Sequence, residues 1–427
     1  MNTVHRFTPK EINGVFDVCV CGGGLAGVAA AVSAAREGSR VILIEKYGFL
    51  GGMATAGLVN PFMKWKENGP SDKLVNAGIF TDLLRRVYET GGSRSPDSRS
   101  FMEEFMKLSL DRLVREYPNI KVLFHSLLTD VYVSDGVIES VTVSGISGNI
   151  KIKAKIFIDA TGNADLSAFS GFAYKLGRDE DGLCQPMTLN FRLSHVDRAK
   201  LNLDEINQKY RALQSSGEIK NPREDVLYFS MPVEDILHLN TTRIVGKNST
   251  DVEEYTESEF EAREQVYEMY RFMRENVTGC ENAHLIMSGT ELGIRESRRI
   301  VGEYEITEDD IVSARKFEDS IARGSYGVDI HNPAGGGTRH ASVPPCDYYT
   351  IPYRSLIPNE SKNLIAAGRP ISSTHAAHSA FRIMPICTCI GEAAGTAAHF
   401  AGKENLAPRE VDVSALRDVL ISHGALL

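Results

Sequence analysis

The chain has 427 residues, of which 42% are hydrophobic and 24% are charged, and this composition is typical of a folded protein with two or three domains rather than a disordered chain. Its formal net charge of −9, without a basic stripe of interleaved aromatic residues, argues against a nucleic-acid partner. No apolar run of eighteen residues and no signal-peptide core occur, and the seven cysteines are an odd number, so we expect a cytoplasmic protein with reduced thiols and no membrane contact.

The first predicted elements are a strand at 17–21, a helix at 25–37 and a second strand at 40–45. Glycines at the first turn permit a sharp bend, leave the backbone open to a pyrophosphate and let the helix pack closely on the strand. An acidic residue ends the second strand, where its carboxylate accepts ribose hydroxyls and disfavours a 2′-phosphate. This order predicts FAD or NAD at the helix N-terminus. The candidate cofactor residues are Gly22, Gly24, Leu25, Ala26, Gly27 and Glu45.

The next segment is dense in glycine and indicates a loop wrapped around the cofactor. From it we assign Lys46, Gly51, Gly52 and Met53 to the cofactor site. Residues 61–104 contain Trp65 and a polar GGSRSPDSRS run, and we interpret them as a surface loop or, alternatively, a lid over the active site.

The middle of the chain alternates between helical and strand patterns. We predict a helix at 101–116, and the apolar segment 121–129, which opens a β meander, contributes Leu128 to the cofactor site. A second domain of mixed α and β elements extends from about 171 to 348. Its predicted elements are a strand at 183–193, a long charged helix at 251–276 and a helix at 308–323.

Two further segments show strand-to-turn patterns. FIDATGNADL, at 157–166, places Ala160, Thr161 and Gly162 at a turn, and NLIAAGRPISSTHAAHSAFRIMPICTCIGEAAGTAA, at 363–398, has a strand that ends in Ala-Gly. We expect a helix to begin near Gly391 and to aim its positive end at the cofactor. From the C-terminal segment we assign Gly368, Arg369, Gly391, Glu392 and Ala393 to the cofactor site.

Together with ELGIRESRRIVGEYEIT (291–307) and YTIPYRSLIP (349–358), these segments resemble the FAD-dependent oxidoreductase family of two-dinucleotide-binding-domain flavoproteins, related to the flavin portion of heterodisulfide reductase. The resemblance covers nearly the whole chain. It implies bound FAD and an α/β fold, with a discontinuous Rossmann-like FAD-binding domain of the glutathione-reductase type and an inserted α+β substrate domain. The expected parts are FAD-binding segments at 1–60, 105–170 and 349–427, an excursion or lid at 61–104, and a substrate or cap domain at 171–348.

The chain departs from these relatives in two places. Arg369 stands where many of them have an acid that binds the ribitol chain, and the closely spaced cysteines of iron–sulfur clusters are missing. A cluster-bearing heterodisulfide reductase is therefore not implied. No spacing typical of zinc or calcium ligands occurs either, so we predict no metal site.

Five polar residues near these motifs are our candidates for catalysis. His331 follows a predicted strand and can act as acid or base, and His375 can move a proton, bind the flavin or cap a helix. Arg382 can anchor a carboxylate, neutralise reduced flavin or form a structural ion pair. Arg298 can bind substrate or join two domains, and Arg354 can contact flavin or substrate or belong to a rigid connection.

These observations lead to a first hypothesis and two alternatives. The first is an FAD-dependent dehydrogenase or reductase that transfers a hydride between flavin and a small hydroxylated or anionic substrate. The second is an electron-transfer or thiol-disulfide flavoprotein, suggested by the pairs Cys19/Cys21 and Cys387/Cys389, although both pairs also fit packing in the core. The third is a flavoprotein without catalytic activity.

Overall fold

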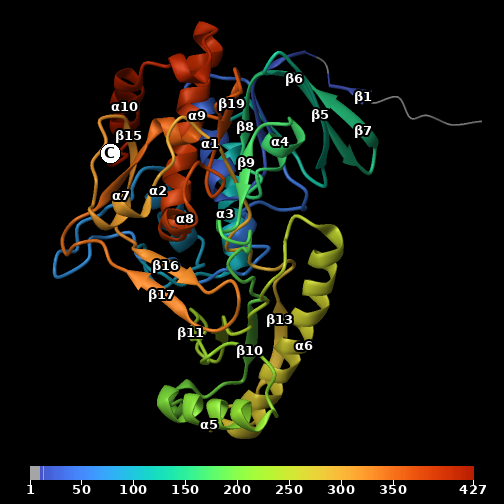
Figure 1. The fold of residues 1–427 in the computed structure, drawn as a ribbon, viewed down its shortest axis with the longest axis vertical. Coiled ribbons are helices and arrows are strands. Elements are labelled where there is room, and N and C mark those ends of the chain that lie inside the picture. Colours follow the sequence, from blue (N-terminus) through green and yellow to red (C-terminus); the bar gives the residue numbers. More distant parts are fainter. Residues whose placement is uncertain (1–9, 13) are drawn as a thin grey trace, which may run out of the picture.

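The computed structural model describes residues 10–12 and 14–427, which form an upper and a lower lobe along the long axis of the molecule (Figure 1). The upper lobe contains a five-stranded parallel sheet in the order β19-β8-β2-β3-β4. Its strands are β2 (Phe16–Cys21), β3 (Val41–Ile44), β4 (Ile120–Leu123), β8 (Ala154–Asp159) and β19 (Leu364–Ala366). This arrangement is the expected Rossmann-like nucleotide-binding sheet.

The two faces of this sheet bury different side chains of β2. Val18 and Val20 pack in one core with the helices α1 (Leu25–Arg36) and α9 (Met384–Glu404), whereas Cys19 and Cys21 pack in another core under the β meander. Alternate residues of a strand point to opposite faces, so both cysteines occupy the same packed face. The meander, ordered β1-β7-β6-β5, contains β1 (Lys10–Glu11), β5 (Leu127–Ser134), β6 (Val137–Gly145) and β7 (Gly148–Ile152).

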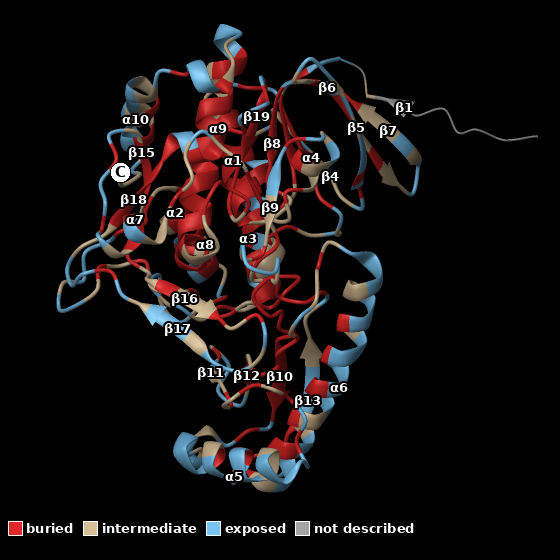
Figure 2. Ribbon diagram, viewed as in Figure 1, coloured by how far each residue is buried: buried red, intermediate tan, exposed pale blue. Residues whose placement is uncertain are grey.

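Helices α1 (Leu25–Arg36) and α9 (Met384–Glu404) are buried over most of their length, as the red ribbons in Figure 2 show. Their backbones approach closely: a Cβ at Gly391 would lie 2.1 Å from the carbonyl oxygen of Ala26, and one at Gly395 would lie 2.0 Å from that of Ala30. The small residues of both helices therefore make this contact possible.

The lower lobe has a core of its own, built from residues between Met187 and Ile294. Its antiparallel sheet has the order β11-β12-β10-β13, and the long helix α6 (Val252–Asn276) shows a buried stripe along one side (Figure 2). Asp251 caps this helix by accepting hydrogen bonds from the amides of Glu253 and Glu254. The elements of the lobe are β10 (Phe191–Ser194), β11 (Tyr228–Ser230), β12 (Leu237–Leu239), β13 (His284–Ser288), α5 (Leu203–Ser216) and α6 (Val252–Asn276).

Three two-stranded sheets complete the structure. They pair β9 (Tyr174–Leu176) with β14 (Arg298–Ile300), β15 (Ser320–Gly324) with β18 (Tyr349–Pro352), and β16 (Val328–His331) with β17 (Thr338–Ala341). The remaining helices are α2 (Ile79–Glu89), α3 (Glu103–Arg115), α4 (Asp165–Phe169), α7 (Glu308–Val312), α8 (His375–Phe381) and α10 (Val413–Ser422). The predicted helix at 308–323 was too long, because α7 ends at Val312 and β15 follows it.

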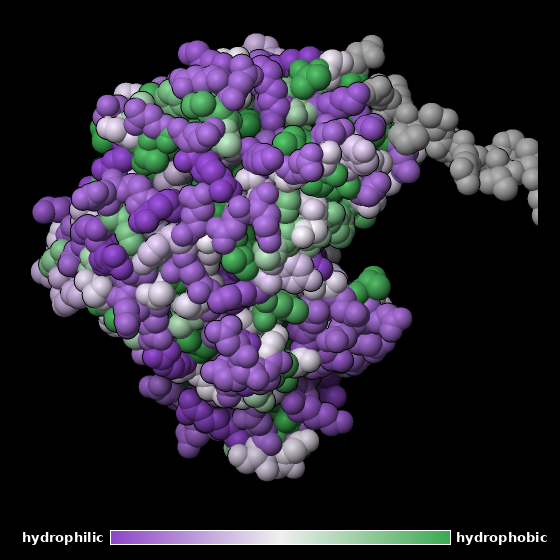
Figure 3. All heavy atoms as spheres, turned by 45° about the horizontal axis from the view of Figure 1, so that its top comes forward, coloured by the Kyte–Doolittle hydropathy of each residue, from purple (hydrophilic) through white to green (hydrophobic). Residues whose placement is uncertain are grey.

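Residues 61–104 do not form a plain surface loop. Phe62, Trp65, Phe80 and Phe101 are buried in the core of the upper lobe and contact one another, and α2 lies within this segment. Most of the surface shown in Figure 3 is hydrophilic, and its hydrophobic side chains form small separate groups. Among the described residues, no helix combines the length and the hydropathy that crossing a membrane requires.

Candidate functional site

A cavity of about 130 Å³ lies at the carboxyl ends of β2, β3, β8 and β19, which is where nucleotide-binding sheets hold their ligands. Most of the predicted cofactor residues line it. They are Gly22, Gly24, Leu25, Ala26, Glu45, Lys46, Gly51, Gly52, Met53, Ala160, Thr161, Gly162, Gly368 and Arg369.

The backbone at Gly24 is open to this cavity. A Cβ built there would meet only the Cα of Gly52, at 3.9 Å. At the end of β3 the carboxylate of Glu45 is held in place, because it accepts hydrogen bonds from the amides of Gly23 (2.7 Å) and Tyr47 (2.8 Å). Burial raises the pKa of Glu45, and the two amide hydrogen bonds oppose that rise. An open glycine backbone beside a fixed carboxylate fits the diphosphate and the ribose of FAD.

Gly27 lets helix α1 pack closely on the turn that follows β2, because a Cβ there would lie 1.8 Å from the carbonyl oxygen of Gly22. Leu128 does not line the cavity, because it lies in the core between the meander and the sheet. Alternation along β5 turns this side chain toward the sheet rather than toward the strand ends.

The predicted helix start near Gly391 is wrong. α9 begins at Met384, with Pro385 in its first turn, so Gly391 and Ala393 lie in the helix interior. Gly391 packs against α1, and Ala393 is buried in the core. Glu392 accepts hydrogen bonds from the amide of Ile79 and from Arg36, and so caps α2 instead of binding the cofactor. The residues of α9 that do line the cavity are Met384 and Cys387, in its first turn.

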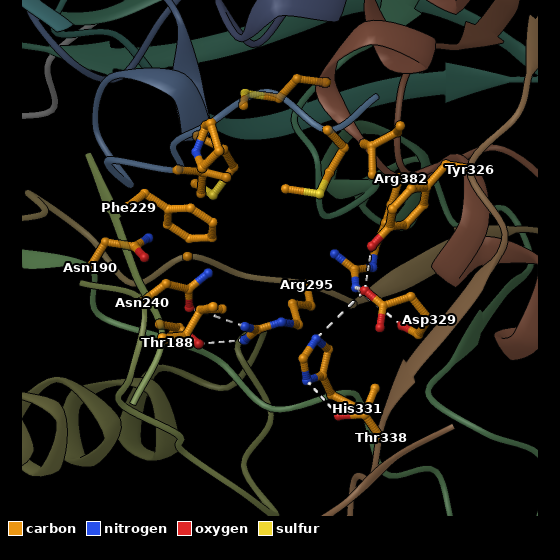
Figure 4. A pocket seen from close by; sticks show the side chains of 18 of the residues that line it. Thr188, Asn190, Phe229, Asn240, Arg295, Tyr326, Asp329, His331, Thr338 and Arg382 are labelled. Carbon is orange, nitrogen blue, oxygen red and sulfur yellow. Dashed lines mark hydrogen bonds and ion pairs between the residues drawn. The ribbon is translucent and has the colours of Figure 1, made fainter. Parts of the chain in front are cut away.

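We call the cavity at the strand ends the cofactor cavity, because the predicted cofactor residues line it. A second cavity of about 600 Å³ adjoins it. In Figure 4, Tyr326, Asp329, Arg382 and His331 lie on one side of it and Asn190, Asn240 and Phe229 on the other, with Arg295 between them. The residues that line both cavities are Met53, Ile294, Arg369, Arg382 and Met384. A ligand in the second cavity would therefore lie next to the cofactor cavity.

Asp329 is the centre of the polar side of the second cavity. Its Oδ2 accepts a hydrogen bond from the hydroxyl of Tyr326 at 2.7 Å and lies 3.6 Å from Nη2 of Arg382. Nδ1 of His340 lies 3.4 Å from the other carboxylate oxygen, and Nε2 of His331 lies 3.8 Å from Oδ2. One carboxylate thus connects four polar side chains at the cavity.

His331 is held as a neutral imidazole. Its Nδ1 lies 3.0 Å from Nη2 of Arg243, which can only donate, so the ring proton is on Nε2 and faces Asp329. Burial lowers the pKa of His331 far below its usual range, and the neighbouring arginines, Arg295 and Arg382 first, lower it further.

The structure brings only two of the five predicted catalytic residues, His331 and Arg382, to the cavities. His375 pairs with the buried Glu296 at 2.8 Å, and Arg298 pairs with Asp165 at 2.9 Å. Arg354 pairs with Asp319 at 2.9 Å and is half exposed. None of these three side chains lines either cavity.

Several cavity residues were missed from the sequence, among them Tyr326, Asp329 and Arg223. Asp329 carried a usable signal, because it lies two residues before His331 in a strand and so shares its face. Arg295 of the RESRR run (295–299) also lines the cavity, whereas Arg298, three residues later, faces Asp165.

Cys387 and Cys389 both contact backbone carbonyl oxygens. The Sγ of Cys387 lies 3.5 Å from the carbonyl oxygen of Phe381 and that of Cys389 lies 3.6 Å from the carbonyl oxygen of Ala77. Burial raises the pKa of each thiol to about 12, so neither is a reactive thiolate near neutral pH. No group of three or more His, Cys, Asp or Glu side chains placed to hold a metal ion occurs within 10–12 and 14–427.

The parallel sheet and the glycine-lined cavity define a dinucleotide-binding α/β protein. The family model described as FAD dependent oxidoreductase matches residues 17–420. The chain therefore belongs to the FAD-dependent oxidoreductase family, as its motifs predict, and FAD is its cofactor.

Other comparisons give more distant similarities. Mitochondrial dihydrolipoyl dehydrogenase of Schizosaccharomyces pombe is 29% identical over 165 residues, which are 37% of this chain and 30% of that relative. A geranylgeranyl bacteriochlorophyll reductase-like protein from Thermoplasma acidophilum is 15% identical, with a TM-score of 0.49 over 97% of this chain and 84% of the other. L-proline dehydrogenase from P. horikoshii is 12% identical, with a TM-score of 0.49 over 98% and 100% of the two chains.

Proposed function

We propose that this enzyme transfers a hydride between FAD and a small polar substrate, hydroxylated or anionic, that binds in the second cavity. The observation that carries this proposal is the adjacency of the two cavities, which share Met53, Arg382 and Met384 among their lining residues. FAD, when bound, supplies the two-electron redox chemistry, and the protein has to orient the substrate and handle its proton.

The Tyr326–Asp329 pair is suited to the proton. The Tyr326 hydroxyl lines the cavity and donates to Asp329 at 2.7 Å, so a proton released by a substrate hydroxyl can reach the carboxylate through Tyr326. His331 supports the pair as a neutral neighbour, since its Nε2 proton faces the same carboxylate. Arg382 lies between the cavities and supplies positive charge beside the reacting groups.

The test is anaerobic mixing of the purified holoenzyme with hydroxy acids, sugars and, after chemical reduction of the flavin, enoates. At least one compound should bleach or restore the flavin absorption. Tyr326→Phe and Asp329→Asn should slow that change by about 10²-fold or more, with FAD content retained.

Arg85→Met is a matched surface control for these variants, because Arg85 is half exposed on α2 and pairs with Asp82 and Glu89. Its rate should equal that of the wild type. If no compound in the panel changes the flavin spectrum although FAD is bound, the proposal fails.

A further inference from the structure

We propose that the substrate of this cavity is a carboxylic acid and that its carboxylate binds the guanidinium of Arg223. This inference rests on the proposed function and names the substrate class. Arg223 lines the second cavity but not the cofactor cavity, so a carboxylate on it leaves the rest of the molecule free to extend toward the shared residues.

The first observation is an unsatisfied donor. Arg223 is 7% exposed, and its Nη1 is buried without a hydrogen-bond partner in the described part of the chain. Its Nε is already used, since it lies 3.1 Å from a carboxylate oxygen of Asp225. Burying a charged donor without a partner is unfavourable, so the structure leaves this nitrogen in need of an acceptor.

The second observation is an excess of positive charge around the cavity. Three carboxylates line it, Glu224, Asp225 and Asp329, and each already lies against an arginine. Five arginines line the same cavity: Arg99, Arg223, Arg295, Arg369 and Arg382.

Arg295 shows that the excess is not neutralised inside the protein. Its guanidinium donates to the hydroxyl of Thr188 and the amide oxygen of Asn240 (Figure 4). It also donates to the carbonyl oxygen of Pro186. Arg369 likewise donates to the carbonyl oxygen of Ile294 and to Asn163. Among the described residues neither arginine has a carboxylate within ion-pair distance, so an anionic ligand would supply the missing charge.

The lining of the cavity favours an organic acid over an inorganic anion. Leu227 and Phe229 line it close to Arg223 in sequence, and Val59 and Met63 add further apolar surface. A guanidinium binds a planar carboxylate through two parallel hydrogen bonds, and the apolar residues can contact the carbon skeleton. At the cofactor side, the Nε of Arg382 is also buried without a partner and can meet a second oxygen of the substrate.

The experiment measures binding to the holoenzyme rather than turnover. Short mono- and dicarboxylates, their uncharged amides and methyl phosphate are titrated while the flavin absorption and the melting temperature are followed. We expect at least one carboxylate to bind and its amide to bind at least about tenfold more weakly.

Arg223→Met should lower the affinity for that carboxylate at least about tenfold, with FAD content unchanged. Arg223→Lys should lower this affinity less, because it keeps the positive charge, and Arg85→Met should bind the carboxylate as tightly as the wild type does. If Arg223→Met does not fold, Arg223→Lys and the acid–amide comparison decide. The inference is overturned if no acid binds, if acid and amide bind equally, if only methyl phosphate binds, or if both Arg223 variants bind the acid as the wild type does.

Failure of this inference and failure of the proposed function give different results. If neutral compounds reduce the flavin and carboxylates do not compete, hydride transfer stands and the carboxylate site is wrong. If carboxylates bind through Arg223 and no compound exchanges electrons with the flavin, the anion site stands and the proposed reaction is wrong.

Discussion

Two glycine-to-alanine substitutions, three residues apart, separate cofactor binding from folding. At Gly24 the backbone has φ −64° and ψ 176°, which alanine adopts without strain, and the new Cβ would meet only the Cα of Gly52 at 3.9 Å. The free energy of unfolding of the apoprotein should therefore change by less than about 1 kcal/mol. The added methyl group lies where the diphosphate would approach, so FAD affinity should fall at least about tenfold, or about 1.4 kcal/mol.

Gly27→Ala should have the opposite pattern. Its Cβ would lie 1.8 Å from the carbonyl oxygen of Gly22 and 3.2 Å from the Cβ of Ala160, so helix and turn must separate by more than an ångström. Such overpacking costs about 1–3 kcal/mol of stability.

Urea unfolding of the apoproteins and fluorescence titration with FAD measure the two quantities separately. The reasoning is refuted if Gly24→Ala binds FAD as tightly as the wild type, or if Gly27→Ala is as stable as Gly24→Ala.

Three further outcomes are expected. Burial lowers the pKa of His238 to about 3, so below its ordinary value of 6.5 the unfolded state binds a proton that the native state does not. The free energy of unfolding should fall by about 2 kcal/mol between pH 7.5 and pH 5 because of this group alone. In urea unfolding at each pH, the free energy of unfolding of His238→Leu should fall less over this range than that of the wild type. An equal fall in the two proteins would contradict this expectation. Gly391→Ala should lower the melting temperature, because its Cβ would lie 2.1 Å from the carbonyl oxygen of Ala26, and an unchanged value would show that the helices can separate freely. Arg382→Met should retain FAD, and its rate of flavin reduction, measured by anaerobic stopped flow, should fall about tenfold or more. A rate equal to that of the wild type would show that Arg382 has no role in flavin reduction.

The helix α9 shows how a local signal can be read wrongly. The predicted start near Gly391 followed the glycine and alanine pattern, but that pattern marks the contact with α1. Pro385 was the better signal, because proline is favoured in the first turn of a helix, and α9 begins at Met384.

The sequence by itself determined the cofactor cavity, since the turn glycines and Glu45 act through short-range backbone geometry next to strands that the hydrophobic pattern defines. Only the tertiary structure decided which polar residues line the second cavity. Arg295 and Arg298 lie three residues apart, yet one lines the cavity and the other pairs with Asp165. Arg223, Asp329 and Arg382 come together from distant parts of the chain, and such meetings depend on how the two lobes pack rather than on any local pattern.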